Sequence, residues 1–178
     1  MKKLYFLVSF VVSATAFAQT FYSENMGTPT TTTAISAHVF QNASPIVYTG
    51  TADARATAPS SGYNGASGSG NILINAIDEF FQIDGLNSSA YPSSDLQLSF
   101  GVNTPTNVSN VLTVEVSTDA TNWTAINYTP TGTGWTLATV SGGVIPSSAT
   151  LSIRFKSSTT LQYRLDDVKL SSVSASCT

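Results

Sequence analysis

Charged residues are rare in this sequence. Only 10% of its 178 residues are charged, with seven Lys and Arg against ten Asp and Glu. Ser, Thr and Asn must therefore supply solubility, as is common in exported β-proteins. Nucleic-acid binding needs clustered Lys and Arg to neutralise phosphates, so the composition excludes nucleic acid as a partner.

Cysteine is almost absent. Cys177 is the only one, so no disulfide can form within the chain. Three alternatives stay open for it: a free thiol, a bond to another molecule, or a place in a linker. Residues 172–178 are polar and small, and we interpret them as a C-terminal tail or a linker to a downstream domain of the same polypeptide.

Histidine is equally rare, with His38 alone in the chain. A serine or cysteine triad would have to use it, yet no Gly-x-Ser-x-Gly turn is present. One histidine cannot build a multi-histidine zinc site. We therefore predict that the protein is not an enzyme and that His38 is a surface or loop-facing strand residue.

Long apolar runs are missing except at the N-terminus. Lys2 and Lys3 precede an apolar run over residues 4–12, which is too short to span a bilayer. A small-x-small site, Ala16-Phe17-Ala18, follows it. This pattern predicts a signal peptide over residues 1–18, and hence a secreted or cell-surface protein, or a periplasmic one if the chain is complete as given.

Cleavage after Ala18 would leave residues 19–171 as one domain, with no later segment apolar enough to span a membrane. Removing Lys2 and Lys3 leaves five basic and ten acidic residues, a net charge of −5. A domain of this length can bury a real core.

Strand periodicity dominates what is present. Leu96, Leu98 and Phe100 alternate with polar residues, as do several later segments. Alternation of this kind is typical of strands with one buried and one wet face. The pattern predicts an all-β fold, an antiparallel jelly-roll β-sandwich of roughly ten strands. The expected strands cover residues 20–24, 52–58, 71–75, 79–83, 96–102, 112–116, 123–126, 134–140, 149–155 and 161–170, with further candidates at 34–40 and 46–48.

The closing strand, residues 161–170, changes phase part-way along. Leu161, Tyr163 and Leu165 share one parity, whereas Val168 and Leu170 fall on the other. A side-chain period of two cannot accommodate this without an inserted residue. We therefore predict a β-bulge at Asp166-Asp167, with this strand lying beside the strand that contains Glu24.

The order of motifs resembles a known group of domains. The matching segments are residues 21–24, 60–70, 96–100, 114–123, 151–155 and 165–170. Together they resemble jelly-roll modules of secreted Bacteroidota-type proteins, and more distantly MAM-like, choice-of-anchor and galactose-binding-like carbohydrate-binding domains. The paired cysteines of MAM domains are absent. The resemblance implies a galactose-binding-like, non-catalytic sandwich that often holds a structural Ca²⁺.

The candidate calcium ligands are Glu24, Asn64, Asp166 and Asp167, because a jelly-roll brings its first and last strands together and Ca²⁺ prefers several oxygen ligands. Two other interpretations stay open. The adjacent acids could pair with Arg154, Arg164 or Lys169, or accept backbone N–H bonds at the bulge. Read as glycosidase carboxylates, they would need a cleft with defined separation, which nothing in the sequence indicates.

The candidate sugar-binding residues are aromatic. Tyr63 and Tyr91 lie in polar loops, and Trp123 and Trp135 adjoin predicted strands. Aromatic rings can stack on the apolar face of a pyranose, although tryptophans also pack commonly in cores. The Gly/Ser-rich loop that holds Tyr63 has no phosphate-binding motif and no following helix, so we interpret it as structural.

These features predict a non-catalytic extracellular module for binding or adhesion. Its expected partner is carbohydrate, as a polysaccharide or a cell-surface glycan. The alternative is a purely structural N-terminal domain of a larger secreted or surface protein. An exposed aromatic patch with convergent polar groups would favour binding, whereas burial of both tryptophans would favour the structural alternative.

Overall fold

Strands make up almost all the regular secondary structure of the described chain. The structure, a computed structural model, describes residues 16–105, 112–128 and 132–175. One sheet, sheet A, contains β1 (Ala16–Glu24), β2 (Thr33–Ala34), β4 (Asp53–Arg55), β5 (Asn71–Ile74), β7 (Leu96–Thr104), β10 (Gly134–Val140) and β12 (Tyr163–Ala175). The other, sheet B, contains β3 (Val47–Gly50), β6 (Phe80–Leu86), β8 (Leu112–Ser117), β9 (Thr124–Ile126) and β11 (Leu151–Ser157). Two short 3₁₀ turns are η1 (Ile35–Ala37) and η2 (Ser93–Asp95).

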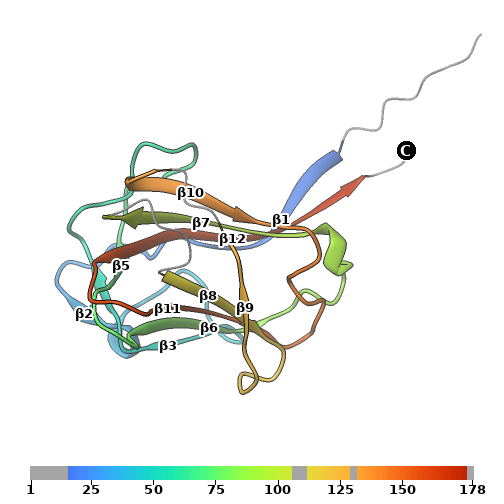
Figure 1. Ribbon diagram of the computed structural model, residues 1–178, viewed down its shortest axis with the longest axis horizontal. Helices are drawn as coiled ribbons and strands as arrows, with labels where there is room; N and C mark the ends of the chain where they lie inside the picture. The colour runs from blue at the N-terminus through green and yellow to red at the C-terminus, as the bar shows by residue number, and fades with distance from the viewer. Residues whose placement is uncertain (1–15, 106–111, 129–131, 176–178) are drawn as a thin grey trace, which may run out of the picture.

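The two sheets face each other as layers (Figure 1). Sheet A runs in the order β10-β7-β12-β5-β4-β2, and β1 pairs with the second part of β12. Sheet B runs in the order β3-β6-β11-β8-β9. All pairings are antiparallel within the described part of the chain. The predicted antiparallel β-sandwich is therefore confirmed.

Alternating apolar residues from both sheets build the core. Leu98, Phe100 and Val102 on β7 are fully buried, as is Phe155 on β11. The rings of Phe100 and Phe155 meet edge-to-face at 5.1 Å between centroids, and so join the two layers. Burying one such side chain contributes about 1.5–3 kcal/mol, so the strands with the cleanest alternation also carry most of the packing.

The closing strand β12 contains the predicted bulge. Its register against β7 shifts between Asp166 and Lys169, and Asp167 adopts a left-handed φ of 50°. The inserted residue returns Val168 to the core face that Leu165 already occupies. Glu24 lies opposite Val168, which confirms that the first strand runs beside the last.

Both ends of the chain extend this pairing further than expected. β12 continues to Ala175 and β1 begins at Ala16, and the two project together from one end of the sandwich (Figure 1). The predicted domain boundary at residue 171 therefore falls inside β12, where Ser172 is buried. The predicted cleavage point after Ala18 lies inside β1. A strand of Ser and Ala has no apolar alternation, so the sequence pattern missed it.

Three expected strands are wrong in extent. Residues 34–40 contain a 3₁₀ turn, and only Thr33–Ala34 pairs as β2. The alternating alanines at 52–58 give a strand only over Asp53–Arg55. Leu161 precedes β12 and is exposed. Short or small side chains supply too little burial to extend pairing, so the period alone misleads.

Residues 1–15, which hold most of the predicted signal peptide, lie outside the described residues, as does Cys177. The signal peptide therefore stays a prediction. In the part of the chain that the structure describes, no helix is long and apolar enough to cross a membrane.

Candidate functional site

The outer face of sheet A carries a row of side chains across five strands. Phe100 and Val102 point into the core, so Gly101 and Asn103, which alternate with them along β7, face outward. Cross-strand pairing then places one outward residue of each strand in line. The row, from β4 to β10, is Asp53, Leu73, Arg164, Asn103 and Trp135.

A loop between β4 and β5 covers part of this face. We call this loop, residues 56–70, the strap. Its Thr57 carbonyl accepts a hydrogen bond of 3.0 Å from Arg164 Nη1, and its Ala58 carbonyl accepts one of 3.3 Å from Trp135 Nε1. The Asn71 amide donates to both carbonyls, at 2.9 and 3.3 Å. Three outward side chains thus hold the strap by its backbone, which explains its fixed path.

Tyr63, at the middle of the strap, reaches back to the sheet. Its hydroxyl donates a 2.6 Å hydrogen bond to Asp167 Oδ2, and a Cβ at position 101 would overlap that hydroxyl. Burial, reinforced by the Asp167 carboxylate, raises the pKa of the Tyr63 phenol. Its ring centroid lies 6.4 Å from that of Trp135, at 48°. Two of the four predicted aromatic residues therefore come together, both only partly buried.

Two arginines, Arg55 on β4 and Arg164 on β12, lie on the same face of sheet A. Arg55 forms a 2.9 Å ion pair with Asp53, while Arg164 bonds to the Thr57 carbonyl and, at 2.8 Å, to Asn71 Oδ1. Burial, together with the positive charge of Arg55, lowers the pKa of the Arg164 guanidinium. Among the described residues, Arg164 forms no ion pair. The face therefore combines aromatic surface, amides and an arginine without a carboxylate partner.

Trp123 lies elsewhere, on the outer face of sheet B. The Arg154 guanidinium sits over its ring at 4.1 Å from the centroid. Glu115 accepts a 2.7 Å hydrogen bond from Arg154 Nε, and both side chains of this ion pair are largely covered, with exposures of 22% and 17%. Trp123 thus contributes to a cation–π and salt-bridge cluster that is already satisfied by its own neighbours.

Tyr91, the fourth predicted aromatic, packs against β1. Its ring stacks on Phe21 with centroids 4.7 Å apart and lies against the main core. No ring contact joins Tyr91 or Trp123 to Tyr63 and Trp135 within the described residues. The structure therefore does not assemble the four into one site.

The predicted metal residues fall into two separate hydrogen-bond networks. Glu24 is fully buried, and its carboxylate accepts bonds from the Tyr48 hydroxyl at 2.7 Å and from the backbone N–H groups of Met26 and Gln41. The Asn42 side chain adds a further bond at 3.1 Å. Glu24 thus fastens the first strand to the segment before β3, a role in which its oxygens are already occupied.

Asp166 and Asp167 form the second network, beneath the strap. Asp166 accepts bonds from the Asp167 N–H at 2.7 Å and from the Ser67 hydroxyl at 3.1 Å. Asp167 accepts from Tyr63 and from the Ser67 N–H. Burial, helped by the negative charge of Asp167, raises the pKa of Asp166 to about 7. The two acids make no ion pair with Arg154, Arg164 or Lys169, and instead accept backbone and side-chain donors at the bulge.

Asn64, the fourth predicted ligand, is exposed on the strap. In the described part of the chain, no three His, Cys, Asp or Glu side chains group as metal ligands. The oxygens that could serve a cation are those of Asp166, Asp167 and the hydroxyls of Ser60 and Ser67, which approach these carboxylates. Calcium stays a prediction, on a smaller set of residues than expected.

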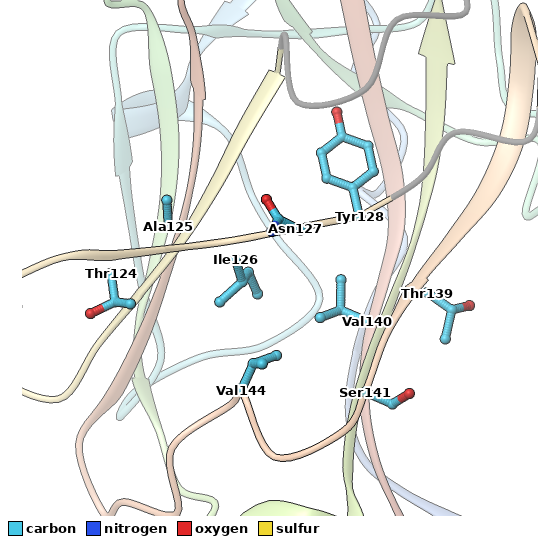
Figure 2. Close-up of a pocket in the computed structure, with 9 residues that line it drawn as sticks. All are labelled: Thr124, Ala125, Ile126, Asn127, Tyr128, Thr139, Val140, Ser141 and Val144. Atoms are coloured by element: carbon cyan, nitrogen blue, oxygen red, sulfur yellow. The ribbon is translucent and has the colours of Figure 1, made fainter.

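A groove lies between the edges of the two sheets, lined by β9 and β10. It has a volume of about 520 Å³. In Figure 2, Ile126, Val140 and Val144 point toward a common space, while the ring of Tyr128 stands beside it. None of the four predicted aromatics and no charged residue lines this groove. The groove is large enough for a ligand, but it lacks the aromatic and charged groups that would orient one. The outer face of sheet A is therefore the stronger candidate site.

His38 directly follows η1 and does not lie in the strand that was predicted there; its side chain is partly exposed. Its Nε2 lies 2.9 Å from the Met26 carbonyl oxygen, and its ring meets Phe40 edge-on at 4.6 Å. Sequence reasoning missed the polar residues that complete the face of sheet A, namely Asn71 and Asn103. Their outward parity on strands was a usable signal, because the core-facing neighbours of each are plainly apolar.

Comparison with known proteins points to fold alone. No family model and no curated protein matches the chain. Among solved structures, it is similar to the C-terminal family 22 carbohydrate-binding module of Clostridium thermocellum Xyn10B, with a TM-score of 0.50, 11% identity, and coverage of 89% of this chain and 96% of that one. The CBM22-1 xylan-binding domain of Paenibacillus barcinonensis Xyn10C is similar with a TM-score of 0.46 and 14% identity, over 92% of this chain and 100% of that one. The K1 cleaved adhesin domain of Lys-gingipain from Porphyromonas gingivalis W83 is similar with a TM-score of 0.45 and 14% identity, over 72% of this chain and 91% of that one.

Proposed function

We propose that this chain is a non-catalytic β-sandwich module that binds carbohydrate on the outer face of sheet A. The observation that carries the proposal is the meeting of Tyr63 and Trp135, with ring centroids 6.4 Å apart, beside polar side chains. Stacking on a partly exposed indole removes apolar sugar surface from water. The amide of Asn103, next to Trp135 in the row, adds directional hydrogen bonding.

The fold supports this proposal. The neighbour that reaches a TM-score of 0.50 is a carbohydrate-binding module with a ligand-binding cleft. A shared fold does not determine function, so the residues of this face carry the proposal. The structural alternative expected both tryptophans to be buried, whereas Trp123 and Trp135 are each partly exposed, which favours binding.

The finer parts of the proposal concern setting and role. We place the module outside the cell, secreted or at the cell surface, on the strength of the predicted signal peptide. Adhesion to a polysaccharide or glycan would then be its task. Absence of catalysis is part of the proposal, and a reducing-sugar assay that detects hydrolysis of a bound oligosaccharide would contradict it.

A structural calcium ion also belongs to the proposal. Asp166 and Asp167 hold the end of the bulge against the strap through Ser67 and Tyr63. An ion that binds only the folded state stabilises it, so EDTA should lower the melting temperature and Ca²⁺ should restore it. An unchanged melting temperature in both conditions would remove calcium from the proposal.

Substitution of Trp135 tests the function. Trp135→Ala removes the stacking surface and should weaken binding to an oligosaccharide found by glycan-array screening about tenfold or more, the equivalent of about 1.4 kcal/mol. Trp123→Ala, which removes the matching indole from sheet B, should leave the affinity unchanged. Calorimetric titration measures both. Equal effects of the two substitutions, or none from Trp135→Ala, would contradict the proposed site.

A further inference from the structure

Arg164 is held in place by only one end of its guanidinium group. Its Nη1 donates to the Thr57 carbonyl at 3.0 Å and to Asn71 Oδ1 at 2.8 Å. An arginine has five N–H donors, of which Nη1 carries two. The Nε and Nη2 groups of Arg164 make no hydrogen bond to another described residue. These two groups form the edge of the fork that matches a carboxylate.

A second arginine lies on the same face of sheet A. Arg55 is opposite Asn71 across β4 and β5, the residue to which Arg164 bonds, and its ion-pair partner among the described residues is Asp53. Arg55 Nε is buried and has no hydrogen-bond partner among the described residues. Among the described residues, Arg55 is thus paired with a carboxylate and Arg164 with none. Asp166, the next outward residue of β12, is turned toward Ser67 beneath the strap. This local excess stands in a chain with a net charge of −3.

The spacing to the aromatic pair suits a chain of sugars. Arg164 and Trp135 pair with opposite sides of Asn103, so they stand two strands apart on the same face. Neighbouring strands are separated by about 4.8 Å, which puts the two side chains about 10 Å apart at the backbone. A saccharide of two or more rings can therefore stack on Trp135 and extend across Asn103 to Arg164.

We infer that the ligand of this face is an acidic glycan, a chain containing hexuronate whose carboxylate binds Arg164. This inference rests on the proposed function and deepens it by naming the substrate class. Arg164 is already positioned by its Nη1 bonds, so binding a carboxylate costs little further ordering of its side chain. The two oxygens of a carboxylate can accept from Nε and Nη2 together, in a bidentate pair.

The ligand series that tests the inference keeps the protein unchanged. Wild-type protein is titrated with an α-1,4-linked oligogalacturonide, with the same oligomer after reduction of its carboxyl groups, and with a sulfated form of the reduced oligomer. We expect the carboxylated form to bind about tenfold or more tightly than the neutral form, as charge-assisted hydrogen bonds imply. Its affinity should fall as salt rises. Equal binding of the sulfated form would overturn the assignment to a carboxylate.

The variant series locates the effect. Arg164→Gln keeps an N–H donor for the strap but removes the charge, and should bring binding of the acidic oligomer down to that of the neutral one. Arg154→Gln makes the same change on sheet B and should have no effect. Because the ligand series needs no variant, misfolding of Arg164→Gln, visible in its circular dichroism, leaves the test intact.

The outcomes separate the two claims. If neutral and acidic oligomers bind equally, and only Trp135→Ala weakens them, the acidic assignment fails while the carbohydrate function stands. If no oligomer binds and Trp135→Ala changes nothing, both fail. A preference for the acidic oligomer that Arg164→Gln abolishes and Trp135→Ala also weakens supports both.

Discussion

The outer faces of the two sheets both contain a tryptophan and an arginine, but the arginine is paired with a carboxylate on only one of them. Each has one tryptophan and an arginine on a central strand, Arg154 on β11 and Arg164 on β12. On sheet B, Arg154 lies directly opposite Glu115, which neutralises it at 2.7 Å, and the guanidinium covers the Trp123 ring. On sheet A, Arg164 lies opposite Asn103 and Leu73, neither of which is charged.

The difference shows that the cross-strand neighbour decides what such a pair can do. Glu115 makes the cluster on sheet B self-sufficient, so a ligand there would have to displace an ion pair. Asn103 on sheet A has a neutral side chain and does not balance the Arg164 charge, so a ligand can supply the missing carboxylate. Composition alone does not distinguish the two faces, because each contains the same kinds of side chain.

The largest effect should come from filling the space above Gly101. Gly101→Ala places a methyl group against the Tyr63 hydroxyl, which must break its bond to Asp167 and move away from Trp135. Overpacking of this kind costs about 1–3 kcal/mol of unfolding free energy, and we expect glycan binding to be lost as well. Chemical denaturation and calorimetric titration measure the two effects.

Gly132→Ala is the matched control, because a Cβ there meets only the Thr136 Cγ2, at 3.8 Å. It should change neither quantity. If Gly101→Ala retained full stability and binding, the packing of Tyr63 against the sheet would not be what shapes the face.

A pH dependence should separate the strap from sheet B. Asp166 has a pKa raised to about 7 in the folded protein, compared with about 4 in an unfolded chain. Between these values the folded state binds more protons than the unfolded state, so stability falls as pH rises from about 4 to about 7 and then levels. Measured in EDTA, Asp166→Asn should flatten this part of the profile and raise the melting temperature at pH 8.

Two outcomes would sharpen or refute that prediction. Added Ca²⁺ should reduce the slope if the ion binds Asp166, because the charged carboxylate is then favoured. An unchanged slope in Asp166→Asn would mean that another group titrates. Glu115→Gln serves as the control on sheet B and should leave the slope as in the wild type.

Much of the fold could be predicted from the sequence because burial imposes a period of two. The strand over Leu96–Thr104 and the bulge at Asp166-Asp167 could both be predicted from the sequence pattern, since a single face of each strand must reach the core. The end of β12 was not, because Ser171 and Ser172 are buried by pairing and carry no apolar signal.

The site was less predictable than the fold. Tyr63 and Trp135 were candidates by residue type, but their meeting depends on a strap held by the carbonyls of Thr57 and Ala58, which have no sequence signature. The sequence indicates Arg164 only as a partner for the adjacent acids. Its true partners come from β5 and the strap, so its role needed the three-dimensional register.

The smallest effect, and the most direct probe of the comparison, is expected from Glu115→Ala. Loss of one partly covered ion pair should cost about 1 kcal/mol of unfolding free energy. It would also free the Nε edge of Arg154 beside Trp123, which recreates on sheet B the combination found on sheet A. In an Arg164→Gln background, we therefore expect weak but measurable binding of the acidic oligomer to return.

Asp78→Ala makes the same charge change by freeing Lys156 from its exposed ion pair, and should not restore binding because Lys156 has no planar fork. Return of binding with Asp78→Ala as strong as with Glu115→Ala would show that net charge, and not the pairing of a free arginine edge with an indole, distinguishes the two faces.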